Sequence, residues 1–493
     1  QVGFFQHFET RITGISWEST GLRMSIAADG NLFIGHIRPV FKWGACDETV
    51  IYVYQKEDLS QYGVMFFDYT IEEKSPKAVT YFENLAVHRE HCVIINRQDE
   101  AGPASNVELN ELYKMYFCQL CNSIGTSLDY NVTHVRPKFV CVNGMAAVIA
   151  SEDRYNIWHF VLPKTNSVQA GIHVPGKSAE YVLEEQQRPI EYGTKRLISN
   201  QADQIAAICI GDTFFLMAIK GKDGIIYKAN LSDGVITNKY MLGIEIDSMK
   251  VNCDFTKVAV VKLVEQVPFA LNIYNFTKTE LQKVYFCEKR EIWDFQWDQN
   301  EPTLLAFKDK MKVCICDCNS VLEQSTCGGG IVCFRDLVVT ICNVEKILTT
   351  PENPVKNCVH EVMIKAKQEV SALLNNMKLD EAMDYAEKSP HAELWNMIAT
   401  YALFKHQFEC AEYAYVKLGD YAGVQFVKRI KIIPSNELRN AEIMAFQDKL
   451  EDAKALFLQC DRKGPGEFLE LSRLIFLFYL DFWRSDFNEK YTD

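Results

Sequence analysis

The chain has 493 residues, of which 48% are hydrophobic and 24% are charged. Its length exceeds the size at which a single hydrophobic core stops growing, so two domains are expected. The composition is ordinary for a globular protein and argues against disordered or fibrous classes. The net charge of -13 argues against nucleic acid as the main partner, because a phosphate backbone attracts basic surfaces.

The cysteines and the apolar runs bear on the cellular compartment. Most of the 17 cysteines lie within apolar strings, such as those around Cys141 and Cys209, which is typical of buried thiols under reducing conditions. The chain begins with Gln1 and shows no secretory signal. Its most apolar stretch, Leu474 to Phe482, is about half as long as a membrane span. We therefore expect a fragment of a soluble intracellular protein.

Residues 1–346 carry the pattern of short strands. Apolar and polar residues alternate from Leu22 to Ala28, and the alternation resumes after Asp29-Gly30, a dipeptide that supplies the positive φ angles of a tight hairpin. The same pattern returns around Asp223-Gly224 and around Asp309-Lys310. Few segments of this half have the period of an amphipathic helix. The pattern predicts an all-β domain.

The hairpins recur along the chain, and the recurrence favours one all-β architecture. Their spacing of roughly 40 to 70 residues is less regular than that of a WD array, and only Trp293-Asp294 and Trp297-Asp298 carry the WD dipeptide. Repetition over so many residues favours a propeller over a sandwich. We predict a β-propeller of about seven irregular WD-type blades over residues 1–346, with blades opening near Trp17, Val79, Val140, Ile208, Val251, Trp297 and Val332.

After residue 346 the pattern changes. Residues 347–358 are expected to form a connector, because proline at 351 and 354 disfavours helix. From Val359 to Leu374 the apolar residues then follow a period of 3.6, which predicts a helix.

The remaining residues predict a tetratricopeptide-like α-solenoid over residues 359–493. Motifs around Ala382, Ala411 and Ala453 place a small residue between larger apolar ones, as helical hairpin repeats require where helices approach closely. Pro390, Gly419-Asp420 and Pro434 are expected between helices. The predicted core includes Trp395, Ala399, Ala402, Ala411, Ala414, Ala441, Ala445 and Ala453.

Three groups of side chains have the composition of a metal site, but each has an ordinary structural explanation. Cysteines three apart on a strand point to opposite faces, alternating cysteines share a face that is usually core, and a His-His-Cys group serves zinc best on a helix. The sequence contains neither a G-x-S-x-G elbow nor a phosphate-binding loop. We expect no metal, no cofactor and no catalytic residue. We assign strand positions to Cys118 and Cys121 and core strand positions to Cys314, Cys316 and Cys318, and we expect His88, His91 and Cys92 on a loop.

Two segments are candidate interaction sites. Lys428, Arg429 and Lys431 form a basic cluster, which is either an ordinary charged face or a docking patch for an acidic partner or an anionic membrane. The run that contains Leu474, Phe476 and Phe478 is apolar on every side of a helix. We expect this second segment to pack against further repeats or another subunit, with a self-capping last hairpin as the alternative.

Several strings resemble a known family. The string from His391 to Ile430 resembles the solenoid of the WD repeat-containing protein 35 family, whose members are subunits of intraflagellar transport complex A. The strings Ile37 to Tyr54, Leu120 to Asp129 and Arg290 to Asn300 resemble the second propeller of that family, in the same order. The resemblance extends from about Arg11 to Lys463, and the string after it departs from the family pattern.

The resemblance implies a non-enzymatic scaffold of the cilium. Complex A joins complex B in trains, supports retrograde transport and ciliogenesis, and helps membrane proteins to enter the cilium. The implied partners are other complex A subunits, with complex B and membrane-protein cargo contacted indirectly and with peripheral membrane association allowed. The implied locations are the cilium or flagellum, the basal body and the cytoplasm. Two alternatives stay open, a coatomer-like or tethering subunit of a vesicle coat, and a propeller enzyme or peptide reader.

Overall fold

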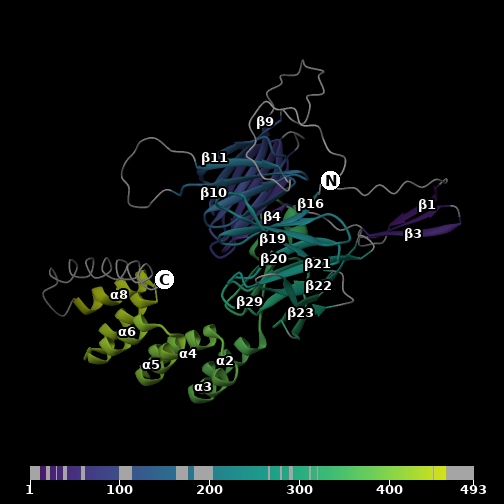
Figure 1. Cartoon of the computed structure of the whole chain (residues 1–493). Coiled ribbons are helices and arrows are strands. Elements are labelled where there is room, and N and C mark those ends of the chain that lie inside the picture. Colours follow the sequence, from purple (N-terminus) through teal and green to yellow (C-terminus); the bar gives the residue numbers. More distant parts are fainter. Residues whose placement is uncertain are drawn as a thin grey trace. The chain divides into compact units, whose positions relative to one another are not determined.

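The structure is a computed structural model of the chain (Figure 1). It describes residues 12–17, 23–28, 30–36, 42–56, 61–98, 114–162, 176–182, 204–264, 267–277, 280–287, 292–309, 312–318, 320–447 and 449–461. Contacts divide the chain into two compact units, Gln1–Val362 and Met363–Asp493. Within the ranges above, no helix combines the length and the apolar character that a membrane crossing requires.

The described part of the first unit forms eight antiparallel sheets, whose strands pair in chain order. One sheet contains β1 (Ile12–Trp17), β2 (Arg23–Ala28) and β3 (Asn31–His36). Blade 1 contains β4 (Trp43–Cys46), β5 (Thr49–Gln55), β6 (Gln61–Asp68) and β7 (Glu73–Thr80), and blade 2 contains β8 (Phe82–His88), β9 (His91–Gln98), β10 (Met115–Asn122) and β11 (Ser127–Thr133). Blade 3 contains β12 (Phe139–Val142), β13 (Ala146–Ala150), β14 (Arg154–His159) and β15 (Lys177–Val182).

The remaining blades follow the same scheme. Blade 4 contains β16 (Ile205–Ile210), β17 (Phe214–Ile219), β18 (Ile225–Asn230) and β19 (Ile236–Met241). Blade 5 contains β20 (Ile246–Val251), β21 (Lys257–Val264), β22 (Val267–Phe276) and β23 (Leu281–Cys287). Blade 6 contains β24 (Asp294–Trp297), β25 (Leu305–Lys308), β26 (Lys312–Cys316) and β27 (Val321–Thr326), and blade 7 contains β28 (Gly330–Arg335), β29 (Val338–Cys342) and β30 (Val359–Met363).

The seven blades form a closed ring. Each innermost strand, the first of its blade, contacts the innermost strand of the next blade, and β28 of blade 7 returns to β4 of blade 1. The predicted propeller of about seven blades is therefore confirmed. Two of the predicted blade openings are wrong. Trp17 ends β1 in the separate three-stranded sheet, and Val79 lies on the outermost strand β7 rather than on an innermost strand.

The burial of the strands follows from their place in a blade. The second strands β13, β17 and β25 are buried at every position, because sheets on both sides cover them. The outermost strands are more exposed: β27 alternates between exposed and partly exposed positions, and β7 has only Val79 buried. Tight hairpins join the strands, and Gly224, with φ of 59°, occupies the turn between β17 and β18 that the Asp223-Gly224 pair predicted.

The ring closes through a core shared by its two ends. Tyr52 and Phe67 of blade 1 pack with Cys342 of blade 7 and with Val344 and Ile347 of the short helix α1 (Val344–Thr349). The hydroxyl of Tyr52 donates a hydrogen bond of 2.5 Å to the carbonyl of Pro351, 299 positions away. Packing of distant segments thus completes the propeller.

The junction between the two patterns differs from the prediction. The residues from Val359 to Met363, predicted as the start of a helix, form strand β30 at the edge of blade 7, after a 3₁₀ helix at Lys356–Cys358. Five residues with apolar side chains at Val359 and Val362 fit one turn of a helix as well as a short strand. These residues form a strand because they pair with β29 at the edge of blade 7.

The second unit consists of helices joined by short turns. They are α2 (Lys365–Asn375), α3 (Leu379–Lys388), α4 (Ala392–Phe404), α5 (Phe408–Leu418), α6 (Tyr421–Ile432), α7 (Asn436–Phe446) and α8 (Leu450–Asp461). Consecutive helices such as α4 and α5, α5 and α6, and α7 and α8 pack against each other. The predicted breaks are confirmed, because Pro390, Gly419-Asp420 and Pro434 lie between helices.

The helices approach each other at small residues. Ala399, Ala402, Ala411, Ala414 and Ala441 are fully buried, and Ala453 and Trp395 are nearly so, which confirms most of the predicted core. Ala445 is only partly buried. Gly419, with φ of 71°, ends α5, and the Asp420 carboxylate then accepts a hydrogen bond of 2.9 Å from the Gly423 amide at the start of α6.

Candidate functional site

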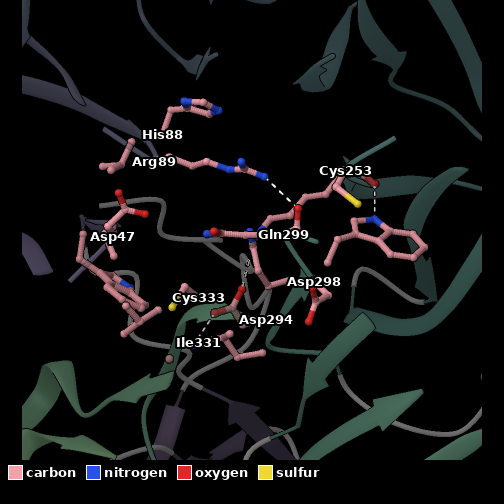
Figure 2. A pocket seen from close by; sticks show the side chains of 18 of the residues that line it. Asp47, His88, Arg89, Cys253, Asp294, Asp298, Gln299, Ile331 and Cys333 are labelled. Carbon is pink, nitrogen blue, oxygen red and sulfur yellow. Dashed lines mark hydrogen bonds and ion pairs between the residues drawn. The ribbon is translucent and has the colours of Figure 1, made fainter. Parts of the chain in front are cut away.

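The innermost strands surround a central cavity of about 1130 Å³ (Figure 2). Every blade contributes residues to its wall, from Trp43 of blade 1 to Ile331 of blade 7. The wall carries several charged side chains, including Arg89, Lys250 and Asp298. The cavity therefore offers both charged and apolar groups to a ligand.

We define the inner turns as the seven turns that join each innermost strand to the second strand of its blade. Because every blade begins with its innermost strand, the inner turns lie on one face of the ring. Between them they contain one basic residue, Arg89, and the eight carboxylates of Asp47, Glu48, Glu90, Asp212, Asp254, Asp298, Glu301 and Asp336. This face is strongly acidic.

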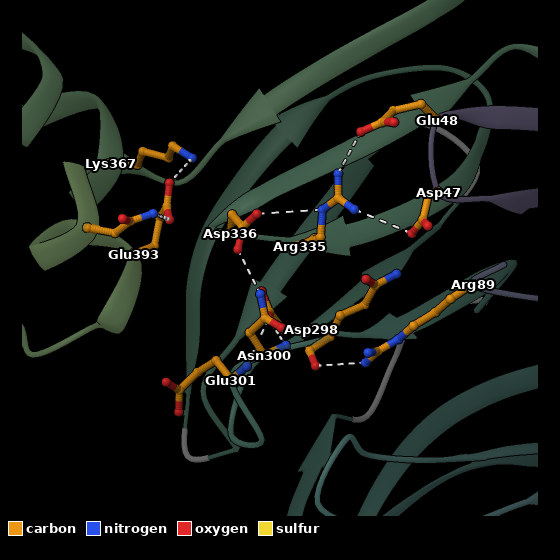
Figure 3. Close-up of polar contacts among 12 residues, drawn as sticks. Asp47, Glu48, Arg89, Asp298, Asn300, Glu301, Arg335, Asp336, Lys367 and Glu393 are labelled. Carbon is orange, nitrogen blue, oxygen red and sulfur yellow. Dashed lines mark hydrogen bonds and ion pairs between the residues drawn. The ribbon is translucent and has the colours of Figure 1, made fainter. Parts of the chain in front are cut away.

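One arginine neutralises part of this charge where the ring closes. Arg335, the last residue of β28, lies 3.4 Å from Asp47, 3.0 Å from Glu48 and 3.5 Å from Asp336 (Figure 3). Asp336 in turn accepts a hydrogen bond of 2.7 Å from the side chain of Asn300 in blade 6. The network links blades 1, 7 and 6.

Arg89 reaches across the mouth of the cavity. It lies in the inner turn of blade 2, and its Nη2 donates a hydrogen bond of 3.0 Å to the carbonyl of Gln299 in the inner turn of blade 6 (Figure 2). Blades 1 and 7 separate these two blades along the ring. The chain thus holds a guanidinium at the backbone of the inner turn that Asp298 begins.

The first residue of the inner turn has a recurring role. In blades 3 and 5 it is an asparagine whose Oδ1 accepts backbone N–H groups of its own turn, Asn143 at 2.7 Å from Ala146 and Asn252 at 2.9 Å from Lys257. The Nδ2 of each donates to a carbonyl in the next blade, Asn143 to Gly211 at 2.7 Å and Asn252 to Pro302 at 2.9 Å. In blades 3 and 5 the side-chain amide of the asparagine therefore links its own turn to the next blade.

Blade 6 has a carboxylate in this position. Oδ1 of Asp298 accepts hydrogen bonds from the amides of Asn300 at 2.8 Å and Glu301 at 2.9 Å, as the asparagines do. Oδ2 has no hydrogen-bond partner, and the residue is 1% exposed. Asp298 therefore has an acceptor, Oδ2, at the position where Asn143 and Asn252 have the donor Nδ2.

Burial shifts the pKa of several groups around the cavity. Burial raises the pKa of Asp298 to about 6, and the neighbouring carboxylates of Asp336 and Glu301 act in the same direction. Burial lowers the pKa of His88 to about 4, with Arg89 and His91 adding to the effect. Burial also lowers the pKa of Lys308. The lowered pKa keeps His88 neutral at neutral pH.

The cysteines and histidines singled out in the sequence occupy structural positions. Cys118 packs toward blade 3 and Cys121 toward blade 1, on opposite faces as predicted. Cys314, Cys316 and Cys318 share one core between blades 5 and 6. The loop predicted for His88, His91 and Cys92 is wrong, because His88 ends β8 and His91 and the buried Cys92 begin β9, with only two residues between the strands. Among the described residues, no three His, Cys, Asp or Glu side chains are grouped to hold a metal ion.

The predicted basic cluster lies on α6, and its side chains make ion pairs within the solenoid. Arg429 lies 3.0 Å from Glu442 of α7, and Lys431 lies 2.8 Å from Glu412 of α5. Lys428 lies 3.9 Å from Glu412 and keeps 55% of its side chain exposed. The cluster therefore links three helices. The apolar candidates Leu474, Phe476 and Phe478 lie outside the described residues.

Sequence reasoning missed the inner turns as a site. Asp298 did appear as the second residue of a Trp-Asp dipeptide. That its Oδ2 lacks a hydrogen-bond donor, however, depends on the neighbouring blade. The Asn143-Gly144 and Asn252 turns are ordinary turn sequences, and only their common place after an innermost strand shows that they are equivalent to the turn of Asp298.

Comparisons with known proteins agree with the two-part fold. The family model described as the WDR35 second beta-propeller matches residues 43–362, and the model described as the IFT80/172/WDR35/WDR19 TPR domain matches residues 394–463. WD repeat-containing protein 35 of Homo sapiens is 28% identical over 92% of this chain and 39% of its own length, and that of Mus musculus is 26% identical over the same shares.

A shorter similarity links the chain to an intraflagellar transport protein. The intraflagellar transport protein 80 homolog of Mus musculus is 27% identical over 17% of this chain and 11% of its own length. The chain spans 39% of the length of the WD repeat-containing relatives. A family model that covers the whole seven-bladed ring, continued by a second model over the helices, establishes that this chain belongs to the WD repeat-containing protein 35 family, of which it contains the second propeller and the start of the solenoid.

Proposed function

We propose that this chain is part of a non-enzymatic scaffold subunit of intraflagellar transport complex A. The observation that supports this most strongly is the collinear similarity to WD repeat-containing protein 35 through both the propeller and the solenoid. A ring of seven blades followed by stacked helices offers broad surfaces for other proteins. In this role the protein supports retrograde transport, ciliogenesis and the entry of membrane proteins into the cilium.

Localisation of the full-length protein tests this role. A fluorescently tagged protein, expressed from its own locus in ciliated cells, is expected at the ciliary base, in the cytoplasm and in particles moving along the axoneme. Loss of the protein should leave transport material at the ciliary tip, because its return to the base fails. A protein found on Golgi or vesicle membranes and never in cilia would favour the alternative, a coatomer-like or tethering subunit.

The basic cluster on α6 is a second, more local proposal. We propose that Lys428, the most exposed of the three cations, contacts an acidic partner or membrane surface, while Arg429 and Lys431 hold the helices together. Replacement of Lys428 by Glu in the full-length protein should reduce recovery of a partner subunit without reducing the melting temperature. Lys388→Glu, at an exposed position that ends α3, is the matched control. Equal recovery from both variants would contradict the proposal.

A further inference from the structure

We propose that the inner turns of the propeller bind a lysine- or arginine-bearing segment of a partner protein, and that the carboxylate of Asp298 receives the cation. The inference goes beyond the scaffold role and does not depend on the assembly in which the protein works. It rests on three observations, namely the unpartnered oxygen of Asp298, the charge of the inner turns and the position of Arg89.

The unpartnered oxygen is the first observation. A buried carboxylate oxygen without a donor destabilises a fold, because it loses its hydration and gains nothing in return. Asn143 and Asn252 show that an amide at this position satisfies both of its polar atoms. Blade 6 nevertheless carries Asp298, whose Oδ2 lacks a partner while the residue lines the central cavity. An ammonium or guanidinium group would supply the missing donor together with the opposite charge.

The negative charge of the face that carries the inner turns is the second observation, and it indicates that the ligand is positively charged. The inner turns carry eight carboxylates, against the cations of Arg89 in a turn and Arg335 at the adjoining strand end. Asp47 and Asp336, which occupy the same position as Asp298 in blades 1 and 7, share Arg335 (Figure 3). Asp298 has no such ion pair. A basic segment would be attracted to this face and repelled by none of its carboxylates.

Arg89 is the third observation. Its guanidinium crosses the cavity mouth and donates to the carbonyl of Gln299, next to Asp298 (Figure 2). The chain thus already accommodates one cation at this mouth. A cation from a partner would approach Asp298 past Arg89, so the two positive charges oppose each other. Removal of the Arg89 side chain should therefore strengthen binding, whereas removal of the Asp298 charge should weaken it.

A binding experiment on the whole 493-residue chain tests the inference. The probe is a short fluorescein-labelled peptide of alternating glycine and lysine, and the readout is fluorescence anisotropy at low ionic strength. The same peptide with every lysine acetylated is the neutral control. We expect the acetylated peptide not to bind, Asp298→Asn to raise the Kd of the lysine peptide about tenfold, and Arg89→Ala to lower it about threefold.

A control variant separates the site from the overall negative charge of the protein. Asp223 lies at the other end of strand β17 from the inner turn of blade 4, and it is exposed. Asp223→Asn removes the same unit of charge, so we expect it to leave the Kd within about twofold of the parent value. Equal weakening by Asp298→Asn and Asp223→Asn would overturn the proposal. Weaker binding by Arg89→Ala, or no binding of the lysine peptide at all, would also overturn it.

Discussion

At the first position of its inner turn, blade 6 has the carboxylate of Asp298, where blades 3 and 5 have the amides of Asn143 and Asn252. The backbone of the turn does not require the charge, because Oδ1 alone accepts the two amide hydrogen bonds of Asp298. The second oxygen is buried without a donor, and burial raises the pKa of the group to about 6. Binding sites often contain residues that lower the stability of the fold, and Asp298 at the cavity wall fits this pattern.

We predict that Asp298→Asn stabilises the propeller at pH 7 by about 1–3 kcal/mol, since each unit of pKa shift corresponds to about 1.4 kcal/mol. The folded state holds the Asp298 proton more tightly than the unfolded state, so the parent chain loses stability as pH rises from about 4 to about 6. The gain from Asn should therefore vanish below about pH 4. Urea denaturation of both chains at pH 3.5 and pH 7 measures the difference.

The reverse exchange supplies the control. Asn143→Asp places a second oxygen 2.7 Å from the carbonyl of Gly211, where the parent has a donor. We expect this variant to lose about 2–3 kcal/mol at pH 7, because both groups are then buried acceptors. If Asp298→Asn proved less stable than the parent at pH 7, our reading of the unpartnered oxygen would be wrong.

At the scale of the elements, small residues set how closely the helices pack. Ala411 on α5 is fully buried, and Gly423 on α6 faces the ring of Tyr415, which a methyl group would overlap. Phe426 and Phe446 then stack with ring centroids 4.0 Å apart. The helices of the solenoid thus combine narrow contacts at alanine and glycine with aromatic contacts beside them.

We predict that Ala411→Leu lowers the free energy of unfolding of the solenoid by about 1–3 kcal/mol, because the added side chain overfills a closed contact. Ala422→Leu, at an exposed position of the neighbouring helix α6, should change it by less than about 0.5 kcal/mol. Chemical denaturation followed by far-ultraviolet circular dichroism compares the two. Identical transitions for both variants would show that the α5 contact is not tightly packed.

At the scale of the whole molecule, the propeller depends on the contact between its first and last blades. Gly330 begins β28 of blade 7 beneath the ring of Trp43 in β4, and a methyl group at Gly330 would overlap that ring. The pair of Arg335 with Asp47 and Glu48 bridges the same two blades at the inner turns. Closure therefore depends on one tight apolar contact and one cluster of ion pairs.

We predict that Gly330→Ala destabilises the propeller by about 1–3 kcal/mol, since the Trp43 ring must move to admit the methyl group. Gly328→Ala, two residues earlier, has no atom within 4 Å of the added methyl group and should be neutral within about 0.5 kcal/mol. Thermal unfolding monitored by tryptophan fluorescence distinguishes them. Equal melting temperatures for the two variants would show that blades 7 and 1 do not pack tightly at Trp43.

Much of this architecture could be predicted from the sequence, because alternating strands and helical periods are local patterns. The recurrence of hairpins predicted the ring, and small residues such as Ala411 and Ala414 predicted the helix contacts. The edge strand β30 could not be predicted, since five residues fit either period and the pairing partner decides. The opening of the ring at Trp43 rather than Trp17, and the unpartnered oxygen of Asp298, both depend on contacts between residues distant in sequence.

The central claim, that this chain belongs to a scaffold of intraflagellar transport complex A, is tested most directly by affinity capture. The tagged full-length protein, expressed at its natural level in ciliated cells, is purified and its partners are quantified by mass spectrometry against an untagged control. Our account predicts that the other subunits of complex A are recovered in near-equal amounts with the tagged protein. Recovery of coatomer or vesicle-tethering subunits in their place would contradict it.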